Sequence, residues 1–298
     1  MVVSIKGVTK RFGAKEVLKN VNLTIPEHSV FGFVGANGAG KTTLMKCMLG
    51  LLPVTSGTIT IAGHPVAFGQ TKSNALIGYL PDVPEFYPYY NAREYLQLCA
   101  VITTMRKSER ASRIEELLEL VGLSQTESPI RTYSRGMKQR LGIAQALLNR
   151  PKLLICDEPT SALDPVGRAQ ILSILQAAKS ETTVFFSTHI LSDAEQICDR
   201  VAMLHEGKII FEDELAALQQ QVNHQFVFTF TTPAEHVLSQ LNDLEHLIYI
   251  EENALIVQLS SERERLQFIR QLTDRNLVIQ SMHAHKKPLE QVVLEVLK

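Results

Sequence analysis

The chain has 298 residues, of which 45% are hydrophobic and 20% are charged, and its formal net charge at pH 7 is −1. This length and composition are typical of a soluble globular protein with one large domain and one small domain. The near-zero charge excludes a broad positive field for nucleic acid, and no apolar run approaches the ~18 residues that cross a bilayer, so we expect any membrane role to depend on a partner.

The first 215 residues or so carry the mixed strand and helix signals of an α/β domain. Met1–Lys6 enters an alternating strand pattern at once, without the apolar core of a signal peptide. The four cysteines are widely spaced and form no C-x-x-C pair, which indicates isolated core residues in a reducing compartment. Strands are predicted at Val2–Val8, Val21–Ile25, Val30–Val34, Thr58–Ile61, Ile77–Leu80, Leu153–Cys156, Thr183–Phe186 and Val201–Leu204.

A glycine-rich loop follows the apolar run Val30–Val34. Residues 35–42, G-A-N-G-A-G-K-T, fit the phosphate-binding pattern G-x-x-x-x-G-K-[ST] at every fixed position. Its glycines lack a Cβ, so the backbone can turn tightly and direct its N–H groups toward one point. The helix that begins near Lys41 adds the positive end of its dipole. We expect Lys41 to neutralise the β and γ phosphates of a nucleotide and the Thr42 hydroxyl to reach Mg²⁺.

The strand signal disappears between about residues 91 and 149. Asn91–Glu94 has the form of a capping box that opens a helix. Ser108–Val121 carries apolar residues at helical spacing and ends at Gly122. A third helix is predicted from about Arg135 to Asn149, closed by the proline at position 151. The sequence therefore predicts an all-helical insert, over about residues 83–150, inside a phosphate-loop core.

The apolar strand Leu153–Cys156 ends in two carboxylates, Asp157 and Glu158. A buried strand that ends there places Asp157 beside the phosphate loop, where it can hold Mg²⁺ through water. Glu158 lies one residue further and can reach the attacking water as a general base. The alternative interpretation of these residues is a strand followed by a solvated acidic turn, which the neighbouring phosphate loop disfavours.

Three further motifs have a structural explanation beside the functional one. His189 follows the strand 184–188 and could hydrogen-bond the γ-phosphate, although a lone histidine is as often a surface or core residue. Ser134, ahead of Gly136, opens a helix whose N-terminus is a second anion site, and capping explains Ser134 equally well. Asp164 is predicted as an N-cap before Pro165; capping explains this residue, and spacing alone leaves a functional role equally open.

The last third of the sequence has a different pattern, β-α-β-β-α-β, which suggests a small ferredoxin-like unit. The predicted domains are therefore 1–220 and 221–298. The motif His283-x-His285 could suggest a metal, but no further ligand cluster supports one, and solvated histidines explain it. Strands are predicted at 225–230, 246–250, 254–259 and 276–282, and helices at 232–241, 261–272 and 288–297.

Over about residues 1–215 these motifs resemble the nucleotide-binding subunits of ABC (ATP-binding cassette) transporters. The resemblance implies that residues 35–43 are the Walker A loop and residues 153–157 the Walker B strand. It implies that residues 134–137 are the signature motif, residues 161–164 the D-loop and His189 the switch histidine. Phe12 matches the aromatic that stacks on adenine, although a core aromatic at the end of the first strand would look the same. The fold implied is α/β, a P-loop core with an antiparallel β subdomain and a helical insert, plus the small α+β C-terminal domain.

The resemblance carries a full set of site residues. The residues implied to bind the nucleotide are Phe12, Gly35, Asn37, Gly38, Ala39, Gly40, Lys41, Thr42, Thr43, Ser134 and Gly136; those implied to act in catalysis are Glu158 and His189; those implied to bind the metal are Thr42, Asp157 and Asp82. The cofactors implied are ATP and Mg²⁺.

Two motifs depart from the family pattern. The usual L-S-G-G-Q signature stands here as Y-S-R-G-M at residues 133–137, which keeps Ser134 and Gly136 but introduces Arg135 and Met137. The glutamine expected after the strand Ile77–Leu80 is replaced by Asp82, which is shorter by about 1.5 Å and, as an anion, favours a Mg²⁺-bound water. Both departures are similar to those of exporter-type bacterial ATPases for drugs and peptide antibiotics, including self-immunity systems.

The resemblance implies an ATPase that powers a membrane exporter from the cytoplasmic face of the cell membrane. Its partners would be a second ATPase subunit, as a homodimer with ATP between the copies, and integral membrane permease subunits; no nucleic acid is expected. The aromatic run Phe86–Tyr90 is a candidate docking surface for the permease, although packing between core and insert would explain it too. Two alternatives stay open: a soluble ABC ATPase acting on ribosomes or nucleic acid, and a small-molecule P-loop kinase.

Overall fold

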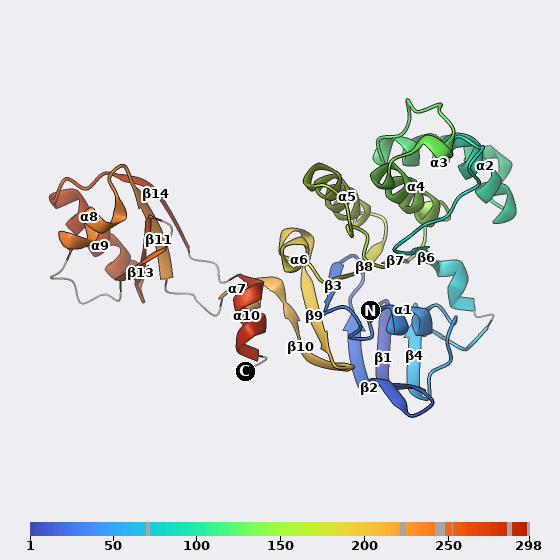
Figure 1. Cartoon of the computed structure of the whole chain (residues 1–298), viewed down its shortest axis with the longest axis horizontal. Coiled ribbons are helices and arrows are strands. Elements are labelled where there is room, and N and C mark those ends of the chain that lie inside the picture. The colour runs from blue at the N-terminus through green and yellow to red at the C-terminus, as the bar shows by residue number, and fades with distance from the viewer. Residues whose placement is uncertain (70–71, 221–224, 242–247, 252, 285–287, 297–298) are drawn as a thin grey trace. The chain divides into compact units, whose positions relative to one another are not determined.

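The computed structural model describes residues 1–69, 72–220, 225–241, 248–251, 253–284 and 288–296. The chain divides into two compact units, Met1–Leu215 and Ala216–Lys298 (Figure 1). The division falls five residues before the predicted boundary between residues 220 and 221. Within the described residues, no helix is long and apolar enough to cross a membrane.

A six-stranded sheet in the order β10-β9-β3-β8-β7-β6 forms the centre of the first unit. Strands β6 to β9 and β3 are parallel, and β10 pairs antiparallel with β9. Every residue of β3, β7 and β8 is buried, which explains why these strands are continuous apolar runs. The strands are β3 (Val30–Val34), β6 (Ile77–Leu80), β7 (Leu153–Cys156), β8 (Thr183–Thr188), β9 (Arg200–His205) and β10 (Lys208–Glu214).

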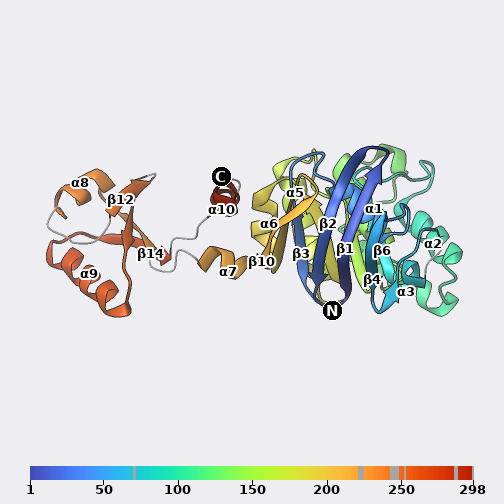
Figure 2. The same ribbon diagram turned by 90° about the horizontal axis from the view of Figure 1, so that it is seen from below.

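An antiparallel sheet in the order β2-β1-β4-β5 packs its apolar face into the same core as α1 and β3. Figure 2 shows β1 and β2 side by side along one face of the unit. This sheet is the antiparallel β subdomain that the resemblance implies. Its strands are β1 (Val3–Phe12), β2 (Lys15–Ile25), β4 (Ser56–Ile61) and β5 (His64–Pro65).

Two strands, β5 and β10, were not predicted from the sequence, and β1 and β2 were predicted too short. β5 is only two residues long, and neither of them is buried. β10 lies at the sheet edge, and none of its residues is fully buried. β2 begins at Lys15. The sequence prediction placed its start at Val21 because most residues in the first half of the strand are polar and accessible to solvent. Edge and hairpin segments of this kind lack the apolar alternation on which strand prediction relies.

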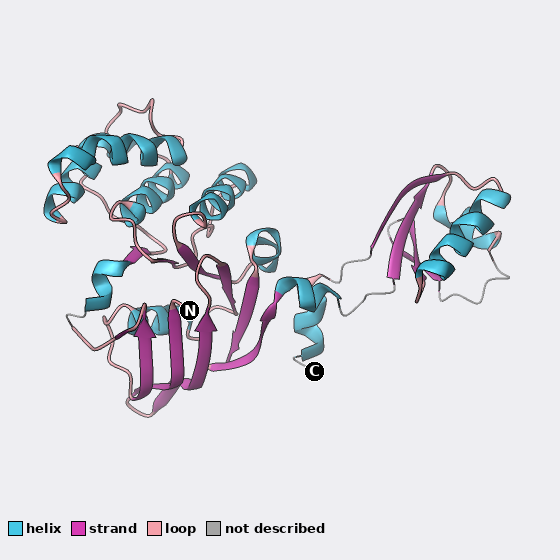
Figure 3. Ribbon diagram, turned by 180° about the vertical axis from the view of Figure 1, so that it is seen from behind, coloured by secondary structure: helices cyan, strands magenta, loops and turns pink. Residues whose placement is uncertain are grey.

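The helical insert is confirmed, with α2 (Ala92–Ile102), α3 (Lys107–Leu120) and α4 (Arg135–Leu147). Figure 3 shows this part of the first unit as helix and loop only. Asn91 accepts a hydrogen bond from the Glu94 N–H and donates its own N–H to the Glu94 carboxylate, both at 2.9 Å, so the predicted capping box is present. The remaining helices of this unit are α1 (Lys41–Met48), α5 (Pro165–Ala178) and α6 (Leu191–Ile197), and two 3₁₀ helices lie at Lys72–Leu76 and Ile130–Thr132.

The second unit contains an antiparallel sheet in the order β12-β13-β11-β14, whose connections give the predicted β-α-β-β-α-β pattern. Its core packs the sheet against α8 and α9 around the fully buried Phe228 and Phe268. The start of the strand predicted at 246–250 and His285 lie outside the described residues. The elements are α7 (Leu215–Gln220), β11 (Gln225–Phe230), α8 (Ala234–Ser239), β12 (Ile248–Glu251), β13 (Ala254–Gln258), α9 (Glu262–Asp274), β14 (Ile279–Ala284) and α10 (Leu289–Val296).

Candidate functional site

The carboxyl ends of the parallel strands in the first unit converge on one pocket. In open α/β sheets this edge is where ligands bind. The loop after β3, the residues that follow β6, β7 and β8, and the turn after β9 all contribute to a pocket of ≈ 770 Å³. Of the residues singled out in the sequence, this pocket gathers Asn37, Gly38, Ala39, Gly40, Lys41, Thr42, Thr43, Asp82, Asp157, Glu158, Ser161 and His189.

The loop between β3 and α1 has the close backbone packing that its glycines require. A Cβ at Gly35 would lie 2.4 Å from the backbone oxygen of Leu204, on the neighbouring strand β9. Gly40 has a φ of 113°, a value that only glycine adopts readily. The loop therefore holds a shape that side chains larger than hydrogen would destroy at these two positions.

Lys41, the first residue of α1, is buried with its ammonium group turned back over the loop. Its Nζ donates to the carbonyl oxygens of Gly35 at 2.6 Å and Ala36 at 3.2 Å. The same Nζ lies 3.1 Å from Glu158 Oε1. The ammonium charge is thus held at the floor of the pocket, where a phosphate would meet it.

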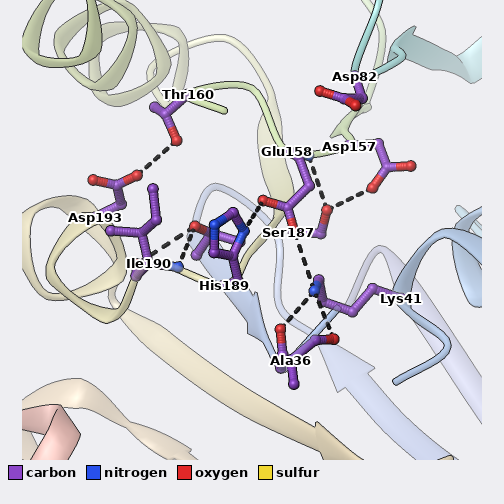
Figure 4. A network of polar contacts seen from close by, with 12 residues as sticks. Ala36, Lys41, Asp82, Asp157, Glu158, Thr160, Ser187, His189, Ile190 and Asp193 are labelled. Carbon is purple, nitrogen blue, oxygen red and sulfur yellow. Dashed lines mark hydrogen bonds and ion pairs between the residues drawn. The ribbon is translucent and has the colours of Figure 1, made fainter. Parts of the chain in front are cut away.

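Glu158 lies between Lys41 and His189, as Figure 4 shows. Its second carboxylate oxygen, Oε2, is 2.8 Å from His189 Nδ1. The Glu158 backbone has a left-handed φ of 48°, which is uncommon for a residue other than glycine. Such conformations persist where the surroundings hold them, often at functional sites. Here the Glu158 N–H donates to Ser187 Oγ at 3.0 Å.

Ser187, the fifth residue of β8, is a member of the site that the sequence analysis missed. Its hydroxyl donates to Asp157 Oδ1 at 2.7 Å and accepts from the Glu158 N–H, and the side chain is fully buried. One serine therefore fixes the carboxylate of Asp157 and the backbone of Glu158 together. A serine within an apolar strand, as in the sequence F-F-S-T-H, was the available signal, because a buried hydroxyl needs partners.

A second buried network lies behind the D-loop. Thr160 Oγ1 donates to Asp193 Oδ2 at 2.6 Å, and Arg168 Nε donates to Asp193 Oδ1. Asp193 is 1% exposed and belongs to α6, just after His189. This network ties the segment after Glu158 to the helix that follows the histidine, and nothing in the local sequence indicated it.

Asp82 lines the pocket, and its side chain pairs with the helical insert. Its Oδ1 lies 3.4 Å from Arg135 Nη2, and its backbone oxygen accepts from Gln139 Nε2 at 2.6 Å. Partial burial is the main cause that raises the pKa of Asp82 above its usual value; nearby Asp157 and Glu158 raise it further, while Arg135 lowers it. The residue that follows β6 and the first residue of α4 are therefore in contact.

Gly35, Ser134, Gly136 and Phe12 do not line this pocket in the part of the chain that the structure describes. Ser134 caps α4 and accepts a hydrogen bond from the Met137 N–H at 3.2 Å, while its side chain remains exposed. Phe12 is 47% exposed, with Lys10 Nζ 4.8 Å from the centre of its ring. Phe12 is therefore not a core aromatic, and its stacking on adenine stays a prediction.

The residues at the pocket fit a magnesium ion delivered with a nucleotide. Thr42 supplies an exposed hydroxyl, and Asp157 and Asp82 supply carboxylates, all on the same lining. Among the residues described, no group of three or more His, Cys, Asp or Glu side chains is arranged to hold a metal ion by itself. This suits Mg²⁺, which takes one or two protein carboxylates and completes its shell with phosphate oxygens and water.

Comparison with known proteins relates both the sequence and the fold to one family. The family described as ABC transporter matches residues 18–161. The ABC transporter ATP-binding protein YxlF of Bacillus subtilis (strain 168) is 36% identical over 99% of this chain and 99% of its own length. The bacitracin transport ATP-binding protein BcrA of Bacillus licheniformis is 40% identical over 71% of this chain and 69% of its own. The lantibiotic transport ATP-binding protein SrtF of Streptococcus pyogenes is 39% identical over 76% and 98%.

Two solved structures show the same architecture. The ATP binding subunit of an ABC transporter matches with a TM-score of 0.66 at 30% identity, over 75% of this chain and 94% of that one. A dimeric post-hydrolysis state of the ATP-binding cassette MJ0796, bound to ADP and Pi, matches with a TM-score of 0.63 at 28% identity, over 71% of this chain and 98% of that one.

Proposed function

The chain belongs to the family of ABC transporter ATP-binding proteins, and from that membership we propose a specific site and mechanism for its ATPase activity. It is the subunit that binds and hydrolyses ATP to power a membrane transporter. The observation that supports the proposed roles is the arrangement Lys41–Glu158–His189 at the pocket floor, with contacts of 3.1 and 2.8 Å. A buried cation, a carboxylate and a histidine are thereby held within reach of one point.

In this proposal the phosphate loop binds the nucleotide, and Lys41 exchanges Glu158 for the β and γ phosphates. The release leaves Glu158 free to accept a proton from the attacking water. His189, 2.8 Å from that carboxylate, orients it and reaches the γ-phosphate. Thr42, Asp157 and Asp82 would hold Mg²⁺, which neutralises charge on the phosphates when bound.

A second copy of the chain completes the site. Donors of one chain, the loop N–H groups and Lys41, cover only one side of a γ-phosphate, whose charge is best stabilised from all sides. Ser134 and Gly136 lie at the N-terminus of the 13-residue helix α4, outside the pocket and accessible to solvent. The start of such a helix attracts anions, so in the proposed homodimer it faces the nucleotide held by the partner.

The permease would dock on a groove beside the insert. This groove, of ≈ 440 Å³, is lined by Val83, Pro84, Phe86 and Pro88 and by residues at the start of α4. Phe86 packs edge-on against Tyr95 of α2 at 5.2 Å, so the packing explanation holds for this residue. Tyr89 is 82% exposed and remains available to a partner. Docking there would place the subunit on the cytoplasmic face of the membrane.

The cargo proposed is an amphipathic peptide or similar antibiotic, moved out of the cell. The relatives BcrA and SrtF, named for bacitracin and lantibiotic transport, support this class of substrate. A strain that lacks the gene should become sensitive to such peptides and regain resistance with the wild-type gene but not with Glu158→Gln. Equal sensitivity of all three strains would contradict the cargo proposal.

The dimer is tested separately with the purified chain. ATPase activity per molecule should rise with protein concentration at saturating ATP and Mg²⁺, because the complete site needs two copies. Specific activity that stays constant down to concentrations at which sedimentation shows only monomer would refute the shared site.

A further inference from the structure

Asp82 and Arg135 each belong to a motif in which this chain departs from the family pattern, and the structure places the two residues together. They are 53 positions apart in the sequence, yet Arg135 Nη2 lies 3.4 Å from Asp82 Oδ1. A carboxylate at the end of β6 is thus matched by a guanidinium at the start of the insert helix α4. An uncharged residue at either position would leave the other charge without this partner.

The electrostatic surroundings of each residue also disfavour its own charge. Arg135 is the first residue of α4, where the positive end of the helix dipole disfavours a cation. Asp82 is close enough to Asp157 and Glu158 for both carboxylates to disfavour its charged form. Pairing offsets both effects, which gives each residue a reason to contact the other when no metal ion competes for Asp82.

The pair is well suited to exchange. The side chains of Arg135 and Asp82 are 45% and 47% exposed, and ion pairs this open to solvent are weak. A second contact, from Gln139 Nε2 to the backbone oxygen of Asp82, uses no charge of Asp82. It can therefore keep α4 near the end of β6 when the carboxylate turns away.

We propose that Arg135 is the resting partner of Asp82 and that the cation carried by ATP displaces it. The inference rests on the proposed nucleotide site. In the nucleotide-free chain Arg135 holds the Asp82 carboxylate toward the insert. When Mg²⁺ arrives with the phosphates, the carboxylate turns to the ion or its water, and Arg135 is released. Arg135 is thus a positioning residue that makes the insert sensitive to the metal rather than to the nucleotide alone.

The test measures binding of a non-hydrolysable ATP analogue, with its β–γ bridge replaced by NH, to chains kept dilute enough to be monomeric. Each affinity is measured with Mg²⁺ and again with EDTA. Because Arg135→Gln removes the competitor for Asp82, it should tighten Mg²⁺-dependent binding roughly 1.4- to 5-fold, the range for an exposed pair. In EDTA it should give no tightening, because a freed carboxylate only repels the phosphates. Arg135→Lys, which keeps the charge, should behave like the wild type.

Lys138→Gln is the matched control, since it removes a positive charge one turn further along α4. Lys138 forms no ion pair with the residues that the structure describes. In an Asp82→Asn background, Arg135→Gln should have no effect. The proposal is overturned if Arg135→Gln matches Lys138→Gln, or if its effect persists without Asp82. A wild-type chain that binds no nucleotide would instead contradict the proposed function, so the two failures are distinct.

Discussion

Glu158→Gln is the change that tests the proposed chemistry most directly. Glutamine has the shape of glutamate, so it can adopt the same left-handed backbone at φ 48° and keep the N–H bond to Ser187. It cannot accept a proton from water. We therefore expect an unchanged fold and a chain that binds ATP but does not turn it over.

The magnitude follows from the role assigned to the carboxylate. Positioned general bases contribute about 10²–10⁴-fold to rates, which corresponds to about 2.7–5.4 kcal/mol of transition-state stabilisation. ATP binding should not weaken, because the substitution also removes an anion that lies 3.1 Å from Lys41 Nζ and would compete with phosphate. The ATP-bound dimer should accumulate.

Phosphate release and size-exclusion chromatography, both with ATP and Mg²⁺, measure these outcomes. Glu85→Gln is the control, because Glu85 is exposed and lies in the groove beside the insert rather than in the nucleotide pocket. Turnover within a factor of about 3 of the wild type would show that another group activates the water. A variant that stays monomeric with ATP would contradict the expected accumulation of the ATP-bound dimer.

Three further predictions test the loop, the insert and the C-terminal unit. In Gly35→Ala the new Cβ would lie 2.4 Å from the backbone oxygen of Leu204, and overpacking of about 1–3 kcal/mol should weaken ATP binding roughly 5- to 150-fold. Unchanged affinity in a fluorescence titration would refute the close packing. Hydrogen bonds from Arg113 lower the pKa of Glu181 below 4.5, so this pair stabilises the fold above that pH and the stabilisation is lost as the pH falls through the lowered pKa. Glu181→Gln should therefore reduce the Tm most near pH 7, and a deficit that does not shrink below pH 4.5 would contradict the assignment. Phe268→Ala removes a fully buried ring from the C-terminal unit, at a cost of about 3–5 kcal/mol in unfolding free energy. Calorimetry should show a lower unfolding temperature for this unit while the affinity for ATP stays the same, and loss of ATP binding would argue against independent units.

The sequence by itself determined the features that depend on neighbouring residues. The glycine pattern and Lys41 predicted the tight loop after β3 and the start of α1, since both are set by a few adjacent residues. The carboxylates after Leu153–Cys156 and the histidine after β8 were placed correctly at the pocket because parallel strands end at a common edge. The capping box at Asn91 and the ferredoxin-like order of the C-terminal unit were likewise predictable from local patterns.

Only the tertiary structure decided which distant side chains meet. Ser187 donates to Asp157, and both Thr160 and Arg168 donate to Asp193. These hydrogen bonds join residues that are 25 to 33 positions apart in the sequence. Their distances depend on how strands and helices stack, which short-range patterns do not specify. Edge strands such as β10 escaped prediction because pairing with a neighbour, rather than an apolar alternation, makes them strands. The meeting of Asp82 with Arg135 belongs to the same class: each looked like a separate departure in the sequence, and packing of the insert against β6 made them one ion pair.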